Sequence, residues 1–167
     1  MSALRGVASA FIHRILSDAG KHIDVFFDLC PISPSDVVYD LGSGDGRLVF
    51  ASAQKGAARA VGIELDSKLV DNARKEAAKR HLDDGVSFIN SDIVDVDLSE
   101  ATVILYYLST AASWALKRKF ESELKTGTRV VAEVFAIPGW KPAREMETAT
   151  GYFYLYVMPP QKIYPDA

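Results

Sequence analysis

The chain has 167 residues, of which 49% are hydrophobic and 25% are charged, and its formal net charge at pH 7 is -3. These values are typical of one soluble globular domain. The negative charge argues against a protein that holds nucleic acid mainly through its phosphates, because that mechanism requires a basic face. No apolar run reaches the ~20 residues of a membrane helix.

The single cysteine, Cys30, excludes an internal disulfide and a cysteine-built metal site, and it favours a reducing compartment. The histidines lack the paired spacing of metal ligands, so no metal site is predicted. Residues 1–20 are basic and amphipathic, with apolar side chains at helical spacing. They fit either a helix packed on the domain or a mitochondrial targeting segment. We therefore predict a cytoplasmic protein, with a mitochondrial location as the alternative.

The next segments read as helices and strands in alternation. Gly20 is expected to end the first helix, and Pro31 a second short one. Apolar runs rich in β-branched and aromatic residues predict strands at 37–41, 58–65, 86–91, 102–108 and 128–137. Helical spacing predicts helices at 46–55, 67–82 and 111–125. This alternation predicts a doubly wound α/β fold with a mostly parallel sheet.

The end of the chain has a different pattern. After residues 138–142, two strand-like segments at 144–148 and 151–158 follow each other without a helix between them. We expect them to form an antiparallel edge of the sheet. The whole chain, 1–167, is thus predicted to be a single domain. It would comprise a helical preface (1–35), an α/β core (36–137) and C-terminal edge strands (138–167).

The first strand ends in the glycine-rich sequence DLGSGDG, residues 40–46. Ligands of open α/β sheets bind outside the carboxyl ends of the strands, and glycines there allow positive φ and close backbone approach. The glycines follow a G-x-G-x-G pattern, whereas dinucleotide-binding turns read G-x-G-x-x-G. Asp40 before the turn and Asp45 within it would repel a pyrophosphate and attract an ammonium group. We therefore expect a ligand with a cationic amino-acid end.

Two further acids close the next strands. Glu64 can accept hydrogen bonds from ribose hydroxyls, and Asp92 from an adenine amino group, with Ile93 against the ring. An ammonium, a ribose and an adenine, in that order, describe S-adenosylmethionine. The predicted cofactor-binding residues are Asp40, Gly42, Ser43, Gly44, Gly46, Glu64, Asp92 and Ile93.

The sequences VVYDLGSGDGRLVF (37–50), AVGIELD (60–66) and NSDIVDVDLSEATVILYYLS (90–109) resemble the class I S-adenosylmethionine-dependent methyltransferases. Residues 116–140 and YLYV (154–157) are similar to a smaller group, the archaeal protein-lysine methyltransferases and the eukaryotic lysine methyltransferases of the ATP synthase c subunit. The resemblance covers about residues 21–158. It implies a Rossmann-like, seven-stranded-type fold and a protein substrate that presents a lysine. It also implies that residues 106–108 border the acceptor site.

A lysine acceptor must lose its proton before methyl transfer, and aromatic surroundings favour the neutral amine. Tyr106 and Tyr107 end the fourth strand; by alternation one of them faces the acceptor and the other packs. Glu133 either helps to remove the proton or has a structural partner, and Trp140 either walls the acceptor channel or packs in a turn. The predicted catalytic residues are Tyr106, Tyr107 and Glu133, and the predicted substrate contacts are Tyr106, Leu108 and Trp140.

Other acceptors leave different signatures. Methylation of an adenine amino group usually uses an Asn/Asp-Pro-Pro-Tyr-like motif after the fourth strand, where this chain reads LYYLST. RNA or small-molecule methylation, and a non-catalytic cofactor-binding subunit, stay open as alternatives. Two basic clusters, at residues 74–80 and 117–119, are either solvated helix faces or local binding patches. No strong nucleic-acid binding is expected, and the sequence leaves the oligomeric state unknown.

Overall fold

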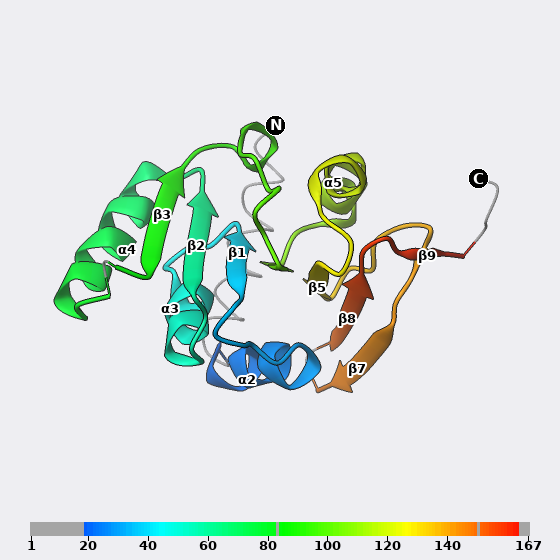
Figure 1. Cartoon of the computed structure of the whole chain (residues 1–167), viewed down its shortest axis with the longest axis horizontal. Helices are drawn as coiled ribbons and strands as arrows, with labels where there is room; N and C mark the ends of the chain where they lie inside the picture. Colours follow the sequence, from blue (N-terminus) through cyan, green and yellow to red (C-terminus); the bar gives the residue numbers. More distant parts are fainter. Residues whose placement is uncertain (1–18, 83, 150, 164–167) are drawn as a thin grey trace.

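The computed structural model describes residues 19–82, 84–149 and 151–163. Its centre is a seven-stranded sheet of order β3-β2-β1-β4-β5-β8-β7 (Figure 1). The strands are β1 (Val37–Leu41), β2 (Arg59–Glu64), β3 (Val86–Asn90), β4 (Val103–Tyr106), β5 (Arg129–Glu133), β7 (Arg144–Thr148) and β8 (Gly151–Val157). β1 to β5 pair in parallel, and β8 runs antiparallel to both of its neighbours. A small separate ladder joins β6 (Trp140–Lys141) to β9 (Gln161–Lys162).

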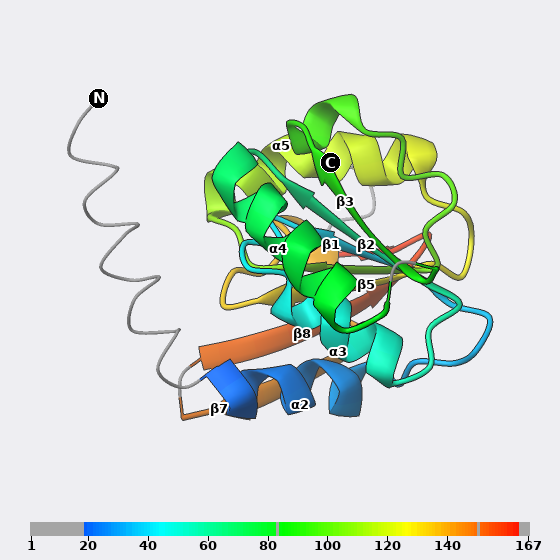
Figure 2. The same cartoon turned by 90° about the vertical axis from the view of Figure 1, so that its left-hand side faces the viewer.

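Helices cover both faces of this sheet. α2 (Ala19–Leu29), α3 (Arg47–Gln54) and α4 (Ser67–Lys79) lie on one face, and α5 (Thr110–Glu123) lies on the other (Figures 1 and 2). A short 3₁₀ turn, η1 (Ile93–Asp95), follows β3. The predicted doubly wound α/β fold with a mostly parallel sheet and an antiparallel edge is confirmed.

Strand order reverses at β1, because β2 and β4 flank it on opposite sides. The chain runs from β1 to β2 and β3 on one side of β1, and then crosses to β4 and β5 on the other side. The crevice at this switch point, outside the carboxyl ends of the strands, is where open α/β sheets bind ligands. The glycine turn that follows β1 therefore stands at this crevice.

Helix signals in the sequence account for the observed boundaries. The Asp66 side chain caps α4 by accepting the Lys68 N–H at 2.8 Å, and Ser109 caps α5. α5 buries Ser113, Leu116 and Phe120 on one side, which gives the spacing of an amphipathic helix. The three predicted helices within the α/β core are confirmed, with ends displaced by at most three residues.

Three expectations need correction or fall outside the described residues. Gly20 does not end a helix, since it lies within α2. β5 ends at Glu133 rather than at residue 137, because Val134 has φ +66° and leaves the extended conformation. The predicted helix between residues 1 and 18 lies outside the residues that the structure describes.

Candidate active site

Backbone hydrogen bonds join the glycine turn to β2. The N–H groups of Gly42 and Ser43 both donate to the carbonyl of Ile63, at 2.9 and 3.0 Å, and Gly46 N–H donates to the Ser43 carbonyl at 2.8 Å. Gly42, Gly44 and Gly46 have φ of +81°, +54° and +81°, which L-residues with side chains rarely adopt. These donors are therefore already engaged within the protein. A pyrophosphate site instead needs such donors to point outward.

Glu64 is held in place by the same turn. Its Oε2 accepts the Gly44 N–H at 3.0 Å, and its Oε1 accepts the Asp66 N–H at 2.9 Å. Each carboxylate oxygen retains further acceptor capacity, so a diol could still donate to this oriented group. A methyl group added to Gly44 would meet no atom within 4 Å, so this part of the turn faces open space. The turn therefore has an open side next to a fixed carboxylate.

Asp40 is the unusual acid of the site. It is 4% exposed, and burial, together with the charges of Asp45, Glu64 and Glu133, raises the pKa of its carboxyl to about 8. Asp45 differs, because the Arg47 guanidinium binds it with Nε 2.9 Å from Oδ1. Within the described part of the chain, no hydrogen bond or ion pair reaches the Asp40 carboxyl. A cation placed beside Asp40 would relieve the repulsion, which matches the predicted ammonium site.

Ser43 has a structural position in this turn. Its hydroxyl is buried and has no hydrogen-bond partner within the described ranges of the chain, and a Cβ added to Gly62 would lie only 2.6 Å from it. The same added Cβ would lie 2.7 Å from the Phe88 ring. β2 thus needs a glycine where the turn packs on it. The Ser43 hydroxyl is directed at Gly62 of β2 and is buried there. A contact between Ser43 and the cofactor would therefore involve atoms of Ser43 other than this hydroxyl.

The third predicted acid, Asp92, lies at the end of β3. Its side chain is exposed and accepts the Val94 N–H at 3.1 Å, which caps η1. Ile93 is half-buried and packs against the core beneath α5. Asp40 is the second-last residue of β1, Glu64 is the last residue of β2, and Asp92 follows β3; these are three adjacent strands of the sheet. The predicted order of the three acids along the crevice is thus present in the fold.

The two adjacent tyrosines, Tyr106 and Tyr107, differ in burial. Tyr106 is fully buried in the α5 side of the core, with its hydroxyl 3.3 Å from Ser113 Oγ and its ring 6.0 Å from the Phe120 ring. The prediction of Tyr106 as a catalytic and substrate residue is therefore corrected: its side chain packs in the core. The predicted strand 102–108 ends earlier than expected, at Tyr106, so Tyr107 is the first residue after β4, and it is only half-buried.

Tyr107 lies beside two residues at the end of β5. Its ring centroid is 6.5 Å from that of Phe135, and burial together with the charge of Glu133 raises the pKa of Tyr107 to about 12. Glu133 is 4% exposed, and its charge also acts on Asp40. Tyr107, Glu133 and Asp40 thus form one electrostatic group at the carboxyl ends of three adjacent strands. The hydroxyl of Tyr107 is neutral at physiological pH and can orient an amine.

The other two predicted substrate contacts have different positions. Leu108 borders the turn, because its Cδ2 would lie 3.4 Å from a Cβ added to Gly42. Trp140 is 1% exposed, and its ring packs 5.7 Å from that of Tyr156 while Nε1 donates to Glu121 at 3.2 Å. The expectation that Trp140 walls an acceptor channel is therefore corrected. It fills the core beneath α5.

Two residues of this edge were missed by the sequence analysis. Phe135 contributes the ring beside Tyr107, and Val134 turns the chain away from β5 with φ +66°. A β-branched residue in this conformation is strained, and such strain clusters at functional sites. Val134 N–H donates to the Tyr152 carbonyl at 2.6 Å, which holds the bend. Phe135 could have been found as an aromatic side chain near the end of the predicted strand 128–137, whereas no local signal marks Val134.

These residues fit S-adenosylmethionine. The buried, partner-free carboxyl of Asp40 suits an ammonium group, the open side of Gly44 suits close passage of the ligand, and the oriented Glu64 suits ribose hydroxyls. The inward-directed donors of the turn disfavour a dinucleotide.

Comparison with known proteins agrees with this site. Residues 40–144 match the model of the ANTKMT methyltransferase domain family. A protein-lysine N-methyltransferase of Saccharolobus islandicus is 36% identical, over 83% of this chain and 89% of the relative. The adenine nucleotide translocase lysine N-methyltransferase of Mus musculus is 34% identical over 70% of this chain, which spans only 51% of that longer protein.

A solved structure is also similar over most of the chain. The RNA methyltransferase from Salinibacter ruber, in complex with S-adenosyl-L-homocysteine, has a TM-score of 0.81 and 37% identity. The alignment covers 87% of this chain and 95% of that structure. The chain therefore belongs to the ANTKMT methyltransferase domain family and is an S-adenosylmethionine-dependent methyltransferase.

Proposed function

We propose that this enzyme transfers methyl groups to the ε-amine of lysines in a protein substrate. The observation that carries the proposal is the grouping of Tyr107, Phe135 and Glu133 beside the glycine turn. An aromatic edge of this kind desolvates an ammonium and lowers its pKa, while a nearby carboxylate and hydroxyl can handle its proton. The protein-lysine N-methyltransferase from Saccharolobus islandicus, 36% identical over most of both chains, supports the same acceptor.

The residues of the chain then have distinct roles. Asp40, Glu64 and Asp92 would hold the cofactor through its ammonium, ribose and adenine groups, respectively. When bound, S-adenosylmethionine supplies a methyl carbon that is activated by the adjacent sulfonium charge. Tyr107 would orient the amine, Glu133 would accept its proton, and Leu108 with Phe135 would exclude water. Alignment and desolvation provide most of such an acceleration.

The direct test uses purified protein and S-adenosylmethionine labelled in the methyl group. The label should enter proteins of a cell extract, and acid hydrolysis followed by mass spectrometry should recover methyl-lysine. Label in RNA alone would contradict the lysine proposal. Cofactor binding by calorimetry without any transfer would instead support a non-catalytic subunit.

RNA is the second candidate acceptor, favoured by one specific observation: the Salinibacter ruber structure, 37% identical, is that of an RNA methyltransferase. Against it stand the net charge of -3 and the absence of an Asn/Asp-Pro-Pro-Tyr-like motif after β4, where the sequence is LYYLST.

The location of the enzyme is also a proposal. We infer a cytoplasmic protein, supported by its single cysteine, Cys30, which is fully buried. Among the described residues, the structure contains no helix with the length and apolar character needed to cross a membrane. Microscopy of the tagged full-length chain, with and without residues 1–20, tests the mitochondrial alternative.

A further inference from the structure

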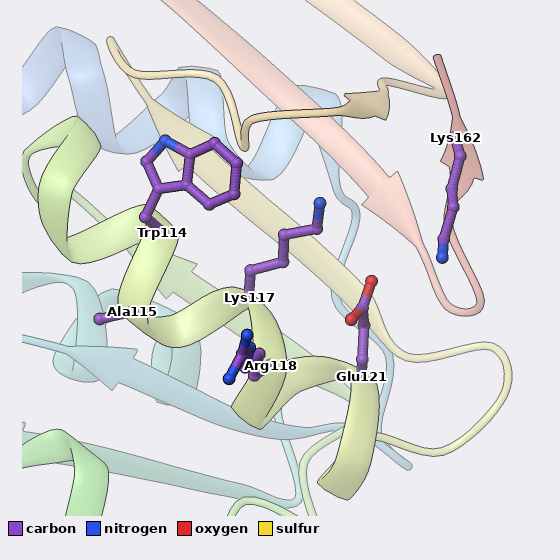
Figure 3. Close-up of a pocket in the computed structure, with 6 residues that line it drawn as sticks. All are labelled: Trp114, Ala115, Lys117, Arg118, Glu121 and Lys162. Atoms are coloured by element: carbon purple, nitrogen blue, oxygen red, sulfur yellow. The ribbon is translucent and has the colours of Figure 1, made fainter. Parts of the chain in front are cut away.

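The outer face of α5 forms a groove with an exposed tryptophan and several cations. The groove has a volume of about 610 Å³ and faces β9 across the surface. Figure 3 shows Lys117 and Glu121 projecting from α5 on the side of β9, and Lys162 extending from β9 toward α5. We call it the basic groove, and it is lined by Trp114, Ala115, Lys117, Arg118, Glu121 and Lys162.

The aromatic part of the basic groove is Trp114. Its side chain is 57% exposed, although indole is among the most costly side chains to leave in water. Lys117 Nζ lies 5.3 Å from the centre of this ring and donates to the Pro138 carbonyl at 3.0 Å. The lysine therefore ties α5 to the loop that follows β5 and holds one side of the indole. A fixed, exposed tryptophan next to cations is the composition of a protein-binding site.

The charges of the basic groove are unbalanced. Arg118 and Lys162 have no ion pair among the described residues, and the one acid, Glu121, accepts the Trp140 indole N–H. Lys119 of the same basic run differs, because it pairs with Glu123 at 2.7 Å and so belongs to another side of the helix. Of the three consecutive cations, only Lys117 and Arg118 face the groove. The net positive charge calls for an acidic partner.

The basic groove lies along the helix that follows Tyr107 and Leu108, two residues of the proposed acceptor site. α5 begins directly after Tyr107 and Leu108, with Ser109 as its cap. At ~1.5 Å per helical residue, Trp114 lies about 7.5 Å and Glu121 about 18 Å along the helix from this cap. An extended peptide advances ~3.3 Å per residue, so these distances correspond to roughly two to five residues from a lysine at the site.

We propose that the basic groove binds an acidic segment of the protein substrate, roughly two to five residues from the lysine that is methylated. This inference rests on the proposed lysine acceptor and adds the sequence context that the enzyme selects. A peptide fits better than a polyphosphate chain, because Glu121 within the groove can accept peptide N–H groups, whereas a polyphosphate chain offers no such donors.

The test uses two synthetic peptides that differ only in charge. Both contain one central lysine. The first peptide has glutamates two to five residues from the lysine, and it is made in two versions, with the glutamates on the N-terminal or on the C-terminal side. The second peptide has glutamines at the same positions. Methylation kinetics are compared for the native chain, the Arg118→Glu/Lys162→Glu variant and Trp114→Ala. The matched control is Lys75→Glu/Lys79→Glu on α4, which makes the same charge change on the opposite face of the sheet.

We expect the native chain to have at least tenfold higher kcat/KM for the glutamate peptide, mainly through a lower KM. The groove variants should lose this preference, whereas the control should keep it and all four proteins should bind S-adenosylmethionine equally. Equal kinetics on both peptides, or an unchanged preference in the groove variants, would overturn the inference.

A binding measurement separates this inference from the proposed acceptor. Fluorescence anisotropy with a labelled glutamate peptide that lacks lysine should show binding to the native chain and the control, and at least tenfold weaker binding to the groove variants. If the glutamate peptide binds in this way but no lysine is methylated in any peptide, the basic groove is supported as a binding site for acidic peptides and the proposed lysine acceptor is refuted. If a single-stranded RNA or vesicles of anionic lipid bind in a groove-dependent manner and the peptide does not, the partner assignment is wrong.

Discussion

At the scale of single residues, Asp40 shows how a fold prepares a site for a charged ligand. Burial and three neighbouring acids place its carboxyl where ionisation is unfavourable in the absence of a cation. Asp45, in the same turn, avoids this cost through Arg47. Among the residues that the structure describes, Asp40 is thus a buried acid without a hydrogen-bond or ion-pair partner, and a ligand that carries an ammonium group would gain from this arrangement.

This leads to a prediction for Asp40→Asn. Cofactor affinity should fall on the order of 100-fold or more, because one partner of a desolvated charge pair is removed. Calorimetric titration with S-adenosyl-L-homocysteine measures the loss, and circular dichroism checks that the fold is intact. If the variant keeps micromolar affinity, Asp40 does not hold the ammonium group.

A pH dependence follows from the same carboxyl. The pKa of Asp40 is about 8 in the folded chain, against an ordinary value of 3.8, so between these values the folded state holds a proton that the unfolded state has lost. Its contribution to the free energy of unfolding is therefore complete below about pH 4 and declines toward about pH 8, by up to about 1.4 kcal/mol per pH unit. Without ligand, Asp40→Asn should lack this decline, and thermal melts from about pH 5 to about pH 8 compare the two. Parallel curves would contradict the pKa assignment.

Tyr106 at the end of β4 and Tyr107 directly after it provide a matched pair of variants. Tyr107→Phe should lower kcat on the order of tenfold with unchanged cofactor affinity, because it removes a hydroxyl that orients the amine. Tyr106→Phe should instead cost about 1 kcal/mol of stability, since it removes the contact with Ser113 and leaves the reacting edge intact. Steady-state kinetics and denaturant melts of both variants separate these effects. The reverse pattern would assign the acceptor edge to Tyr106.

At the scale of elements, the turn after β1 depends on the strand beside it. Gly62 of β2 leaves space for both the Ser43 hydroxyl and the Phe88 ring. Close packing of turn on strand is what directs the N–H groups of the turn to Ile63 and Glu64. The shape of the ligand site is therefore a property of two strands and their connection together.

Gly62→Ala tests this dependence. The added methyl group would lie 2.6 Å from Ser43 Oγ, so the turn must move, and we expect a loss of about 1–3 kcal/mol in stability together with weaker cofactor binding. Gly85→Ala is the control, since a methyl group there meets no atom within 4 Å. Chemical denaturation and calorimetry of both variants measure the difference. Full affinity in Gly62→Ala would show that the turn tolerates displacement.

At the scale of the whole molecule, cofactor binding should stabilise the entire fold, because the site is built from elements across the middle of the sheet. A ligand at 100 times its Kd adds about 2.7 kcal/mol, which in a domain of this size raises Tm by roughly 5–10 °C. Thermal scans with S-adenosyl-L-homocysteine should show this rise, and scans with a nicotinamide dinucleotide should not. Stabilisation by the dinucleotide would contradict the electrostatic account of the turn.

Most of the sheet and the identity of the cofactor could be predicted from the sequence, because they depend on local signals. Runs of β-branched residues, helix caps and the spacing of three glycines act within a few residues of each other. The acceptor side could not be predicted in the same way. Tyr106 and Tyr107 are the same residue type at adjacent positions, so the sequence does not distinguish their roles. The sequence around Trp140 fits a residue that lines the acceptor channel and a packed core residue equally well.

The sequence by itself determined the α/β fold, the acid and glycine pattern of the crevice and the resemblance to methyltransferases, since each is encoded in contiguous segments. Only the tertiary structure decided that Tyr107 faces Glu133 while Tyr106 packs, that Trp140 is buried on Tyr156, and that Lys162 joins α5 in one groove. The physical reason is that these facts depend on which face of the sheet each side chain occupies and on contacts between distant segments. Strand register determines which face a side chain occupies, and long-range packing determines which distant segments meet; local propensity determines neither.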